Sequence, residues 1–188
     1  RLLDREGHRV VDTGMTVRDD GGVRPTTAQS LAALRPAYKE AGVITAGNSA
    51  QISDGAAGAL ILSGARAAEL GLAARARFLS FATAAVDPVV MHTATAPATA
   101  TALARAGLTM ADIAVAEVHE GYAAAVLAWI ADTGADPGRV NPNGGAIALG
   151  HPLGGSGARL MTTLVHHMKR ENVRYGLVVS GKSRPEAD

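Results

Sequence analysis

The sequence alternates between apolar runs of strand length and segments with helical periodicity, and this alternation constrains the fold most. Apolar runs cover residues 55–62, 76–84, 113–118 and 175–179. Segments with helical spacing follow them at residues 63–70, 97–106, 122–131 and 158–169. Because short connections join these segments, the pattern predicts an α/β fold with a buried, at least partly parallel sheet covered by helices.

The first 45 residues differ from the rest because they are polar and rich in turn-forming residues. Residues 9–17 can form a strand, and Asp19-Asp20-Gly21-Gly22 favours a turn. Thr26 or Thr27 can cap a short helix that extends to Leu34, ahead of Pro36. We therefore interpret residues 1–45 as a connecting region and residues 46–188 as the main domain.

Charge and cysteine content exclude several classes of function. The 18 basic and 17 acidic residues give a net charge of +1, so no strong field attracts nucleic acid or an acidic membrane. No apolar run reaches the roughly 18 residues of a membrane span, and no signal-peptide pattern is present. We expect a cytoplasmic protein. The sequence contains no cysteine, which excludes disulfides, thiolate metal sites and a thiol nucleophile on this chain.

A glycine-rich segment surrounds His151. Between residues 143 and 157 it contains Gly144, Gly145, Gly150, Gly154, Gly155 and Gly157. Glycine permits close backbone approach to a ligand, which favours a catalytic histidine in a cleft. A tight crossing in the core with a fully bonded histidine is the alternative. A dinucleotide-binding loop fits less well, because the spacing is not G-x-G-x-x-G and the segment does not follow a first strand.

A second polar pair, His119 and Glu120, follows the apolar run at residues 113–118. Ligands of open α/β sheets bind at the carboxyl ends of strands, so this pair is a second candidate site. A surface histidine beside an acid favoured by the helix dipole is the alternative. His166 and His167 are interpreted as part of a solvated helix face, and His92 has no evident partner. No histidines are spaced as metal ligands, so we expect no metal site.

Four blocks of the sequence together resemble the thiolase family of acyl-CoA acyltransferases, which cleave 3-ketoacyl-CoA or condense two acyl-CoA molecules. They are RPTT at residues 24–27, TAGNSAQISDGAA at 45–57, VHEGYA at 118–123 and NGGAIALGHPLGGSG at 143–157. The last block is the most specific. The resemblance extends to about Val179 and corresponds to roughly half of a complete thiolase, its C-terminal half. It implies that residues 1–45 are the end of the N-terminal half or a connecting segment. Residues 46–188 would then form a thiolase-like C-terminal domain with a mixed sheet covered by helices, from which the N-terminal half and the final strand are missing.

The resemblance also implies a role for each candidate residue. His151 takes the position of the base that activates a thiol, and its N–H also faces the thioester oxygen. His119 stands where the family has the asparagine of its NEAFA block, on the oxyanion side. Glu120 is expected to support these two histidines without contacting the substrate itself. The substrates would be coenzyme A thioesters, with no separate cofactor, and the residues expected near them are Ser49, Ala50, Gly150 and Gly154.

The sequence departs from the family at both of its cysteines. The nucleophilic cysteine belongs to the N-terminal half, and Ser180 or Gly181 stands where the second cysteine would lie. We therefore expect an acyltransferase portion that is inactive alone and needs an N-terminal half or a homo-oligomer. Alternatives are a non-catalytic CoA-binding or scaffolding subunit and a small dinucleotide-binding domain. Ser156 is interpreted as a helix cap, and His119 and His151 should meet near the strand ends.

Overall fold

The computed structural model describes residues 2–3, 10–11, 14, 16 and 18–181, in two units that comprise residues 1–33 and 34–188. In the first unit, β1 (Leu2–Leu3) pairs antiparallel with β2 (Val10–Val11), and α1 spans Ala28–Ala32. The predicted cap is confirmed, because the Ser30 N–H donates to Thr27 Oγ1 at 3.0 Å. The predicted turn is confirmed by the Gly22 N–H, which donates to Asp20 Oδ1 at 2.7 Å. Most of the strand expected at residues 9–17 lies outside the described residues.

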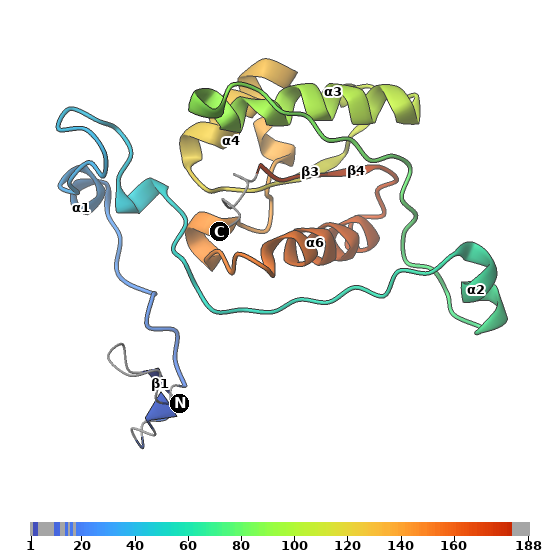
Figure 1. Cartoon of the computed structure of the whole chain (residues 1–188), viewed down its shortest axis with the longest axis horizontal. Coiled ribbons are helices and arrows are strands. Elements are labelled where there is room, and N and C mark those ends of the chain that lie inside the picture. Colours follow the sequence, from blue (N-terminus) through green and yellow to red (C-terminus); the bar gives the residue numbers. More distant parts are fainter. Residues whose placement is uncertain (1, 4–9, 12–13, 15, 17, 182–188) are drawn as a thin grey trace. The chain divides into compact units, whose positions relative to one another are not determined.

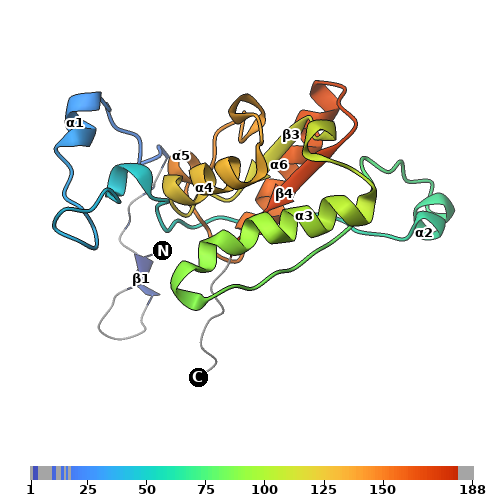
Figure 2. The same ribbon diagram turned by 90° about the horizontal axis from the view of Figure 1, so that it is seen from above.

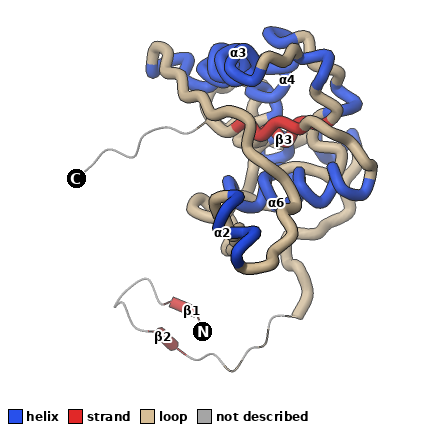
Figure 3. The backbone as a smooth tube through the Cα atoms, turned by 90° about the vertical axis from the view of Figure 1, so that its right-hand side faces the viewer, coloured by secondary structure: helices blue, strands red, loops and turns tan. Residues whose placement is uncertain are grey.

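The second unit is built around two parallel strands, β3 (Val115–Val118) and β4 (Gly176–Val179). Their register pairs Val115 with Gly176 and Val118 with Val179. Helices α3 (Thr95–Ala106) and α4 (Ala123–Thr133) lie on one side of the strands, and α6 (Ser156–Arg170) lies on the other (Figures 1 and 2). The view along the strands in Figure 3 shows this three-layer order. The α/β architecture expected from the sequence is confirmed.

The two faces of β3 enter different environments because strand side chains alternate. Ala116 and Val118 join the core formed with α3 and α4, in which Trp129 is only 1% exposed. Val115 and Glu117 belong to the opposite face, against which α6 packs. Gly176 of β4 allows this close contact, since a Cβ there would lie 2.7 Å from Met168 Sδ. A charged side chain, Glu117, is therefore buried beneath α6.

Helix ends follow the sequence signals closely. α3 ends at Gly107 and α4 at Gly134, both in the left-handed conformation that glycine adopts without strain. α2 spans Gly64–Glu69 and is capped by Ser63, while α5 is the single turn Ala146–Leu149. Short 3₁₀ helices occupy Ala46–Asn48, Pro88–Ala94, Met110–Asp112 and Pro137–Arg139. None of the described helices combines the length and apolarity that crossing a membrane requires.

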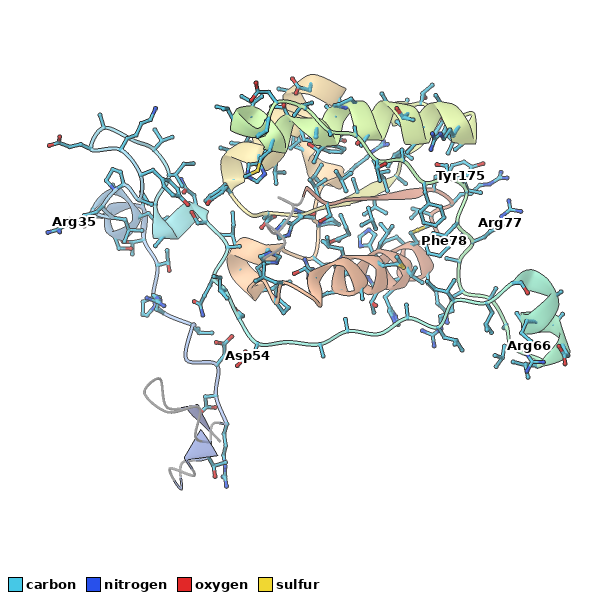
Figure 4. The ribbon with its side chains drawn as sticks, viewed as in Figure 1. Arg35, Asp54, Arg66, Arg77, Phe78 and Tyr175 are labelled. Carbon is cyan, nitrogen blue, oxygen red and sulfur yellow. The ribbon has the colours of Figure 1, made fainter. Side chains whose placement is uncertain are left out.

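Two of the four expected strands are wrong. Residues 55–62 and 76–84 are extended but form no ladder, and Leu60 and Phe81 are 78% and 67% exposed. Figure 4 labels Asp54, Arg66, Arg77 and Phe78 along the stretch of chain that contains these two runs. An apolar run becomes a strand only when another strand pairs with its backbone groups. Neither run has such a neighbour, so within the described part of the chain the main sheet contains two strands, β3 and β4.

Candidate active site

His119 lies at the carboxyl edge of the parallel sheet. It directly follows the last residue of β3, and its backbone N–H donates to the carbonyl oxygen of Val179, the last residue of β4, at 2.8 Å. The backbone of His119 therefore lies beside the carboxyl ends of both strands. This edge is where ligands of open α/β sheets bind.

His151 is held by its backbone against the segment that begins at Gln51. Its N–H donates to the Gln51 carbonyl at 2.7 Å, and its carbonyl accepts from the Ser53 N–H at 3.4 Å. The preceding Gly150 has φ +88°, and a Cβ there would lie 2.3 Å from Ser53 Oγ. Only glycine satisfies both conditions, so Gly150 acts by fixing the backbone position of His151.

The imidazole rings of His119 and His151 lie against each other. Their ring centroids are 4.2 Å apart, and the ring planes are inclined by 46°. The prediction that His119 and His151 approach each other near the strand ends is confirmed. Two motifs that are distant in the sequence thus form one polar site.

Glu120 links the glycine-rich segment to the end of β3. Its carboxylate accepts from Asn141 Nδ2 at 2.6 Å and from the Ile147 N–H at 3.2 Å. A Cβ at Gly145 would lie 2.0 Å from the Glu120 carboxyl carbon, so the absence of a side chain there makes this contact possible. These contacts join Glu120 to Asn141 and Ile147, and its support of the histidine pair stays a prediction.

Asn141 is a structural residue of this site that sequence reasoning missed. Its Oδ1 accepts from the Val118 N–H at 2.7 Å, and its Nδ2 donates to the Val118 carbonyl at 2.8 Å. Its φ of +47° is unusual for a residue other than glycine, although asparagine tolerates it. The NPNG run at residues 141–144 signals a turn, but its contact with β3 depends on the tertiary fold.

Ser156 is not the helix cap expected from the sequence. It is the first residue of α6, and the cap residue, Gly155, has no side chain to cap the helix. The Ser156 hydroxyl instead contacts His151 Nδ1 at 2.6 Å and donates to the Pro152 carbonyl at 3.1 Å. A buried serine therefore forms part of the site.

The residues expected near coenzyme A lie on two stretches of the chain, residues 49–50 and 150–154, and their contact with a substrate stays a prediction. The Ala50 N–H donates to the Gly121 carbonyl at 3.0 Å, and the Ser49 hydroxyl donates to the Thr45 carbonyl at 2.7 Å. Gly154 lines a surface hollow of about 360 Å³ between residues 53–57 and 152–155. Ser180 is exposed and follows β4.

Glu117 and Arg159 are two further ionisable residues whose polar atoms are buried. Glu117 is fully buried, and neither carboxylate oxygen has a hydrogen-bond partner among the described residues. The Arg159 guanidinium nitrogens are also buried without a partner in that part of the chain. Burial raises the pKa of Glu117 to about 7, although the charge of Arg159 opposes this shift. Neither residue was identified from the sequence.

The site favours neutral imidazoles. Burial lowers the pKa of His119 to about 4, with added contributions from His151, Arg159 and His92. Burial and the charge of Arg159 also lower the pKa of His151. His92, which lacked an evident partner in the sequence, packs edge-on against Tyr122 at 5.7 Å between ring centroids. Neutral imidazoles can accept a proton or donate a hydrogen bond near neutral pH.

Two protein-family models match this sequence. The family model described as "Thiolase, C-terminal domain" matches residues 72–184, and "Thiolase, N-terminal domain" matches residues 5–65. The chain belongs to the thiolase family. The transition between the two models lies at residues 66–71, whereas the boundary proposed from composition lies at residue 45. That earlier boundary stays a prediction.

Thiolases from bacteria share about half of their matched residues with this chain. It is 47% identical over 181 residues to a 3-ketoacyl-CoA thiolase of Pseudoalteromonas translucida, covering 94% of this chain and 46% of that protein. It is 50% identical over 151 residues to an acetyl-CoA acetyltransferase of Rhizobium meliloti, covering 80% of this chain and 38% of that one. The chain thus spans less than half the length of these two thiolases.

Solved thiolase structures match the fold. Human mitochondrial 3-ketoacyl-CoA thiolase in complex with CoA superposes with a TM-score of 0.79 and 32% identity, covering 90% of this chain and 43% of that one. The acetyl-CoA acetyltransferase of Bacillus anthracis gives a TM-score of 0.78 and 34% identity, covering 82% of this chain and 39% of that one. The thiolase fold is therefore present in this chain.

Proposed function

We propose that this chain is the part of a cytoplasmic thiolase-type acyltransferase that supplies the base and the oxyanion-side residue. Its reaction would be 3-ketoacyl-CoA thiolysis or the reverse condensation of acyl-CoA. The observation that supports this most strongly is the His119–His151 pair at the strand ends, with ring centroids 4.2 Å apart. The lowered pKa of His151 keeps its imidazole neutral near neutral pH, the form in which it can accept a proton.

The proposed role of His151 is to take the proton of a cysteine thiol supplied by an N-terminal thiolase half. The resulting thiolate attacks the keto carbonyl of 3-ketoacyl-CoA, and the bond between the α and β carbons breaks. The acyl group stays on sulfur, while acetyl-CoA leaves as an enolate that takes up the proton held by His151. The thiol of a second CoA then gives its proton to the neutral His151 and attacks the acyl-enzyme, which releases the shortened acyl-CoA and restores the cysteine thiolate beside the protonated His151.

The proposed role of His119 is to donate a hydrogen bond to the oxygen that becomes negative during attack. Its backbone is fixed at the ends of both strands, so its side chain needs little reorganisation. A preorganised donor of this kind contributes about 2.7–4 kcal/mol to lowering a barrier. The positive charge of Arg159, which also lowers the pKa of both histidines, would further favour an oxyanion.

The absence of cysteine also supports a second candidate function. With no thiol in the sequence and Ser180 following β4, the chain could bind coenzyme A without catalysing a reaction. This alternative predicts CoA binding that persists without turnover under every condition of the test below.

The test follows the loss of 3-ketoacyl-CoA absorbance with the purified chain, alone and mixed with the N-terminal part of the Pseudoalteromonas thiolase. We expect no turnover by the chain alone and measurable turnover in the mixture. His151→Ala should reduce the rate of the mixture by about 10²–10⁴-fold, because base catalysis is lost. His166→Ala is the matched control, since His166 lies on α6 and contacts Arg75 rather than the site.

Three outcomes would contradict the proposal. Turnover by the chain alone would show that the nucleophile has been misidentified. An active mixture unaffected by His151→Ala would refute the role of His151. CoA binding measured by calorimetry, together with an inactive mixture, would favour the non-catalytic alternative.

A further inference from the structure

We propose that Ser156 is a positioning residue that holds His151 as the Nδ1–H tautomer and so leaves Nε2 free as the base. The proposal rests on the proposed function, because it takes His151 to be that base. It adds a residue that the sequence indicated only as a helix cap, and it explains the hydrogen-bonding pattern around the ring.

The two contacts of the Ser156 hydroxyl determine which atom donates in each hydrogen bond. Ser156 Oγ lies 2.6 Å from His151 Nδ1 and 3.1 Å from the Pro152 carbonyl oxygen. A serine hydroxyl has one hydrogen to donate, and a carbonyl oxygen can only accept. When the hydroxyl donates to Pro152, its oxygen must accept from His151. The proton of the neutral ring then lies on Nδ1, and Nε2 carries the lone pair.

Local structure fixes both partners of this hydrogen bond. Ser156 is 3% exposed and begins α6, where its own N–H donates to the Pro152 carbonyl at 2.8 Å. The backbone of His151 is held by the Gln51 carbonyl at 2.7 Å. Because the ring is anchored at its backbone and at Nδ1, its orientation relative to His119 is determined.

This arrangement suits a base that changes its protonation state during turnover. When Nε2 takes a proton, Nδ1–H continues to donate to Ser156 Oγ, and the hydroxyl continues to donate to Pro152. The ring therefore accepts and releases the proton without rotating. A hydrogen-bond partner at one ring nitrogen selects the tautomer of a histidine and so determines which nitrogen can act as the base.

One competing arrangement makes the proposal testable. The Pro152 carbonyl also accepts the N–H groups of Gly155 at 2.9 Å and Ser156 at 2.8 Å. If those two donors displace the hydroxyl, its hydrogen would point to His151 Nδ1 and the ring proton would lie on Nε2. The two arrangements place the proton on opposite nitrogens, which a spectrum distinguishes.

The experiment is side-chain ¹⁵N NMR of the full chain labelled with ¹⁵N-histidine, recorded above pH 7. The signals of His151 are assigned by their loss in His151→Gln. We expect a protonated, pyrrole-type Nδ1 and an unprotonated, pyridine-type Nε2. In Ser156→Ala the Nδ1–H signal should shift toward the unprotonated position, because its acceptor is gone. Ser156→Thr keeps the hydroxyl and should retain the wild-type pattern.

Thr162→Ala is the matched control. Thr162 lies on the same helix, but its hydroxyl donates only to the Ala158 carbonyl, at 2.8 Å, so the His151 signals should not change. A wild-type His151 protonated on Nε2 would overturn the proposal, as would unchanged signals in a folded Ser156→Ala. If Ser156→Ala fails to fold, the wild-type and Ser156→Thr spectra still decide the tautomer. No catalysis is measured, so an inactive mixture would refute the proposed function and leave this result intact.

Discussion

At the scale of single residues, the site is governed by ionisable groups that the fold buries together. Glu117 points to the α6 side of β3, while His119 begins the connection that follows the same strand. Burial disfavours the charged form of both groups, so the pKa of Glu117 rises to about 7 and that of His119 falls to about 4. Their opposite shifts have opposite consequences for stability.

The two groups should give opposing pH dependences of the free energy of unfolding. Glu117 has a raised folded-state pKa, so its contribution is complete below its ordinary value of 4.5 and is lost as pH rises through about 7. His119 has a lowered pKa, so its contribution is complete above 6.5 and is lost as pH falls through about 4. Between pH 5 and 7 the two effects oppose each other.

Single variants should separate these effects. We expect Glu117→Gln to be less stable at pH 5 than at pH 7, because the buried neutral His119 remains. His119→Asn should be more stable at pH 5 than at pH 7, by about 1–3 kcal/mol, because the buried neutral Glu117 remains. Urea unfolding followed by the fluorescence of Trp129, the single tryptophan of the chain, measures both. Slopes of the same sign in the two variants would contradict the pKa directions.

At the scale of elements, the site depends on how the glycine-rich segment turns at Gly150. This residue combines a positive φ with close packing against Ser53, and it places the backbone of His151. A side chain at this position is disfavoured by both conformation and space.

Gly150→Ala should therefore destabilise the chain by about 1–3 kcal/mol. Gly157→Ala is the matched control, because Gly157 lies in α6 and no atom lies within 4 Å of the added Cβ. The control should leave stability unchanged or raise it by up to about 1 kcal/mol. Urea unfolding compares the two variants, and equal stabilities would show that the turn does not require glycine.

Local sequence signals predict the ends of the helices, whereas strand pairing depends on contacts that form only in the folded chain. Helix ends were predicted well, since Thr27, Ser63, Gly107 and Gly134 act through local geometry. The meeting of His119 and His151 was predicted from their motifs beside apolar runs. Residues 55–62 and 76–84 were wrong as strands, because pairing depends on a neighbouring strand rather than on composition. Ser156 was assigned to a cap because its partner, His151, becomes evident only in the folded chain.

At the scale of the whole molecule, large apolar side chains are exposed on the stretch between Ile52 and Val89. Ile52, Leu60, Phe81 and Val89 are 78%, 78%, 67% and 91% exposed. Exposed apolar surface of this kind marks an interaction surface or an aggregation risk. An interaction of this surface with a second polypeptide stays a prediction, tested by the association experiment that follows.

The purified chain should associate with itself when no partner is present. Light scattering over a range of concentrations should give a mass above the 19.1 kDa of one chain. Replacing Leu60 and Ile61 with serine should reduce this association, because both are exposed in an unpaired segment. Leu127→Ser is the control, since Leu127 is 64% exposed on α4 instead. A single-chain mass at high concentration would contradict the expectation.

The claim that His151 activates a thiol on a partner is tested most directly by the reactivity of that thiol. The measurement is the rate at which iodoacetamide alkylates the cysteine of the N-terminal thiolase part, followed against pH with and without this chain. Because the thiolate is the reactive form, a base beside it shifts the rate profile to lower pH. The account predicts this shift with the wild-type chain and its loss with His151→Ala. A profile that the wild-type chain and His151→Ala shift equally would contradict it.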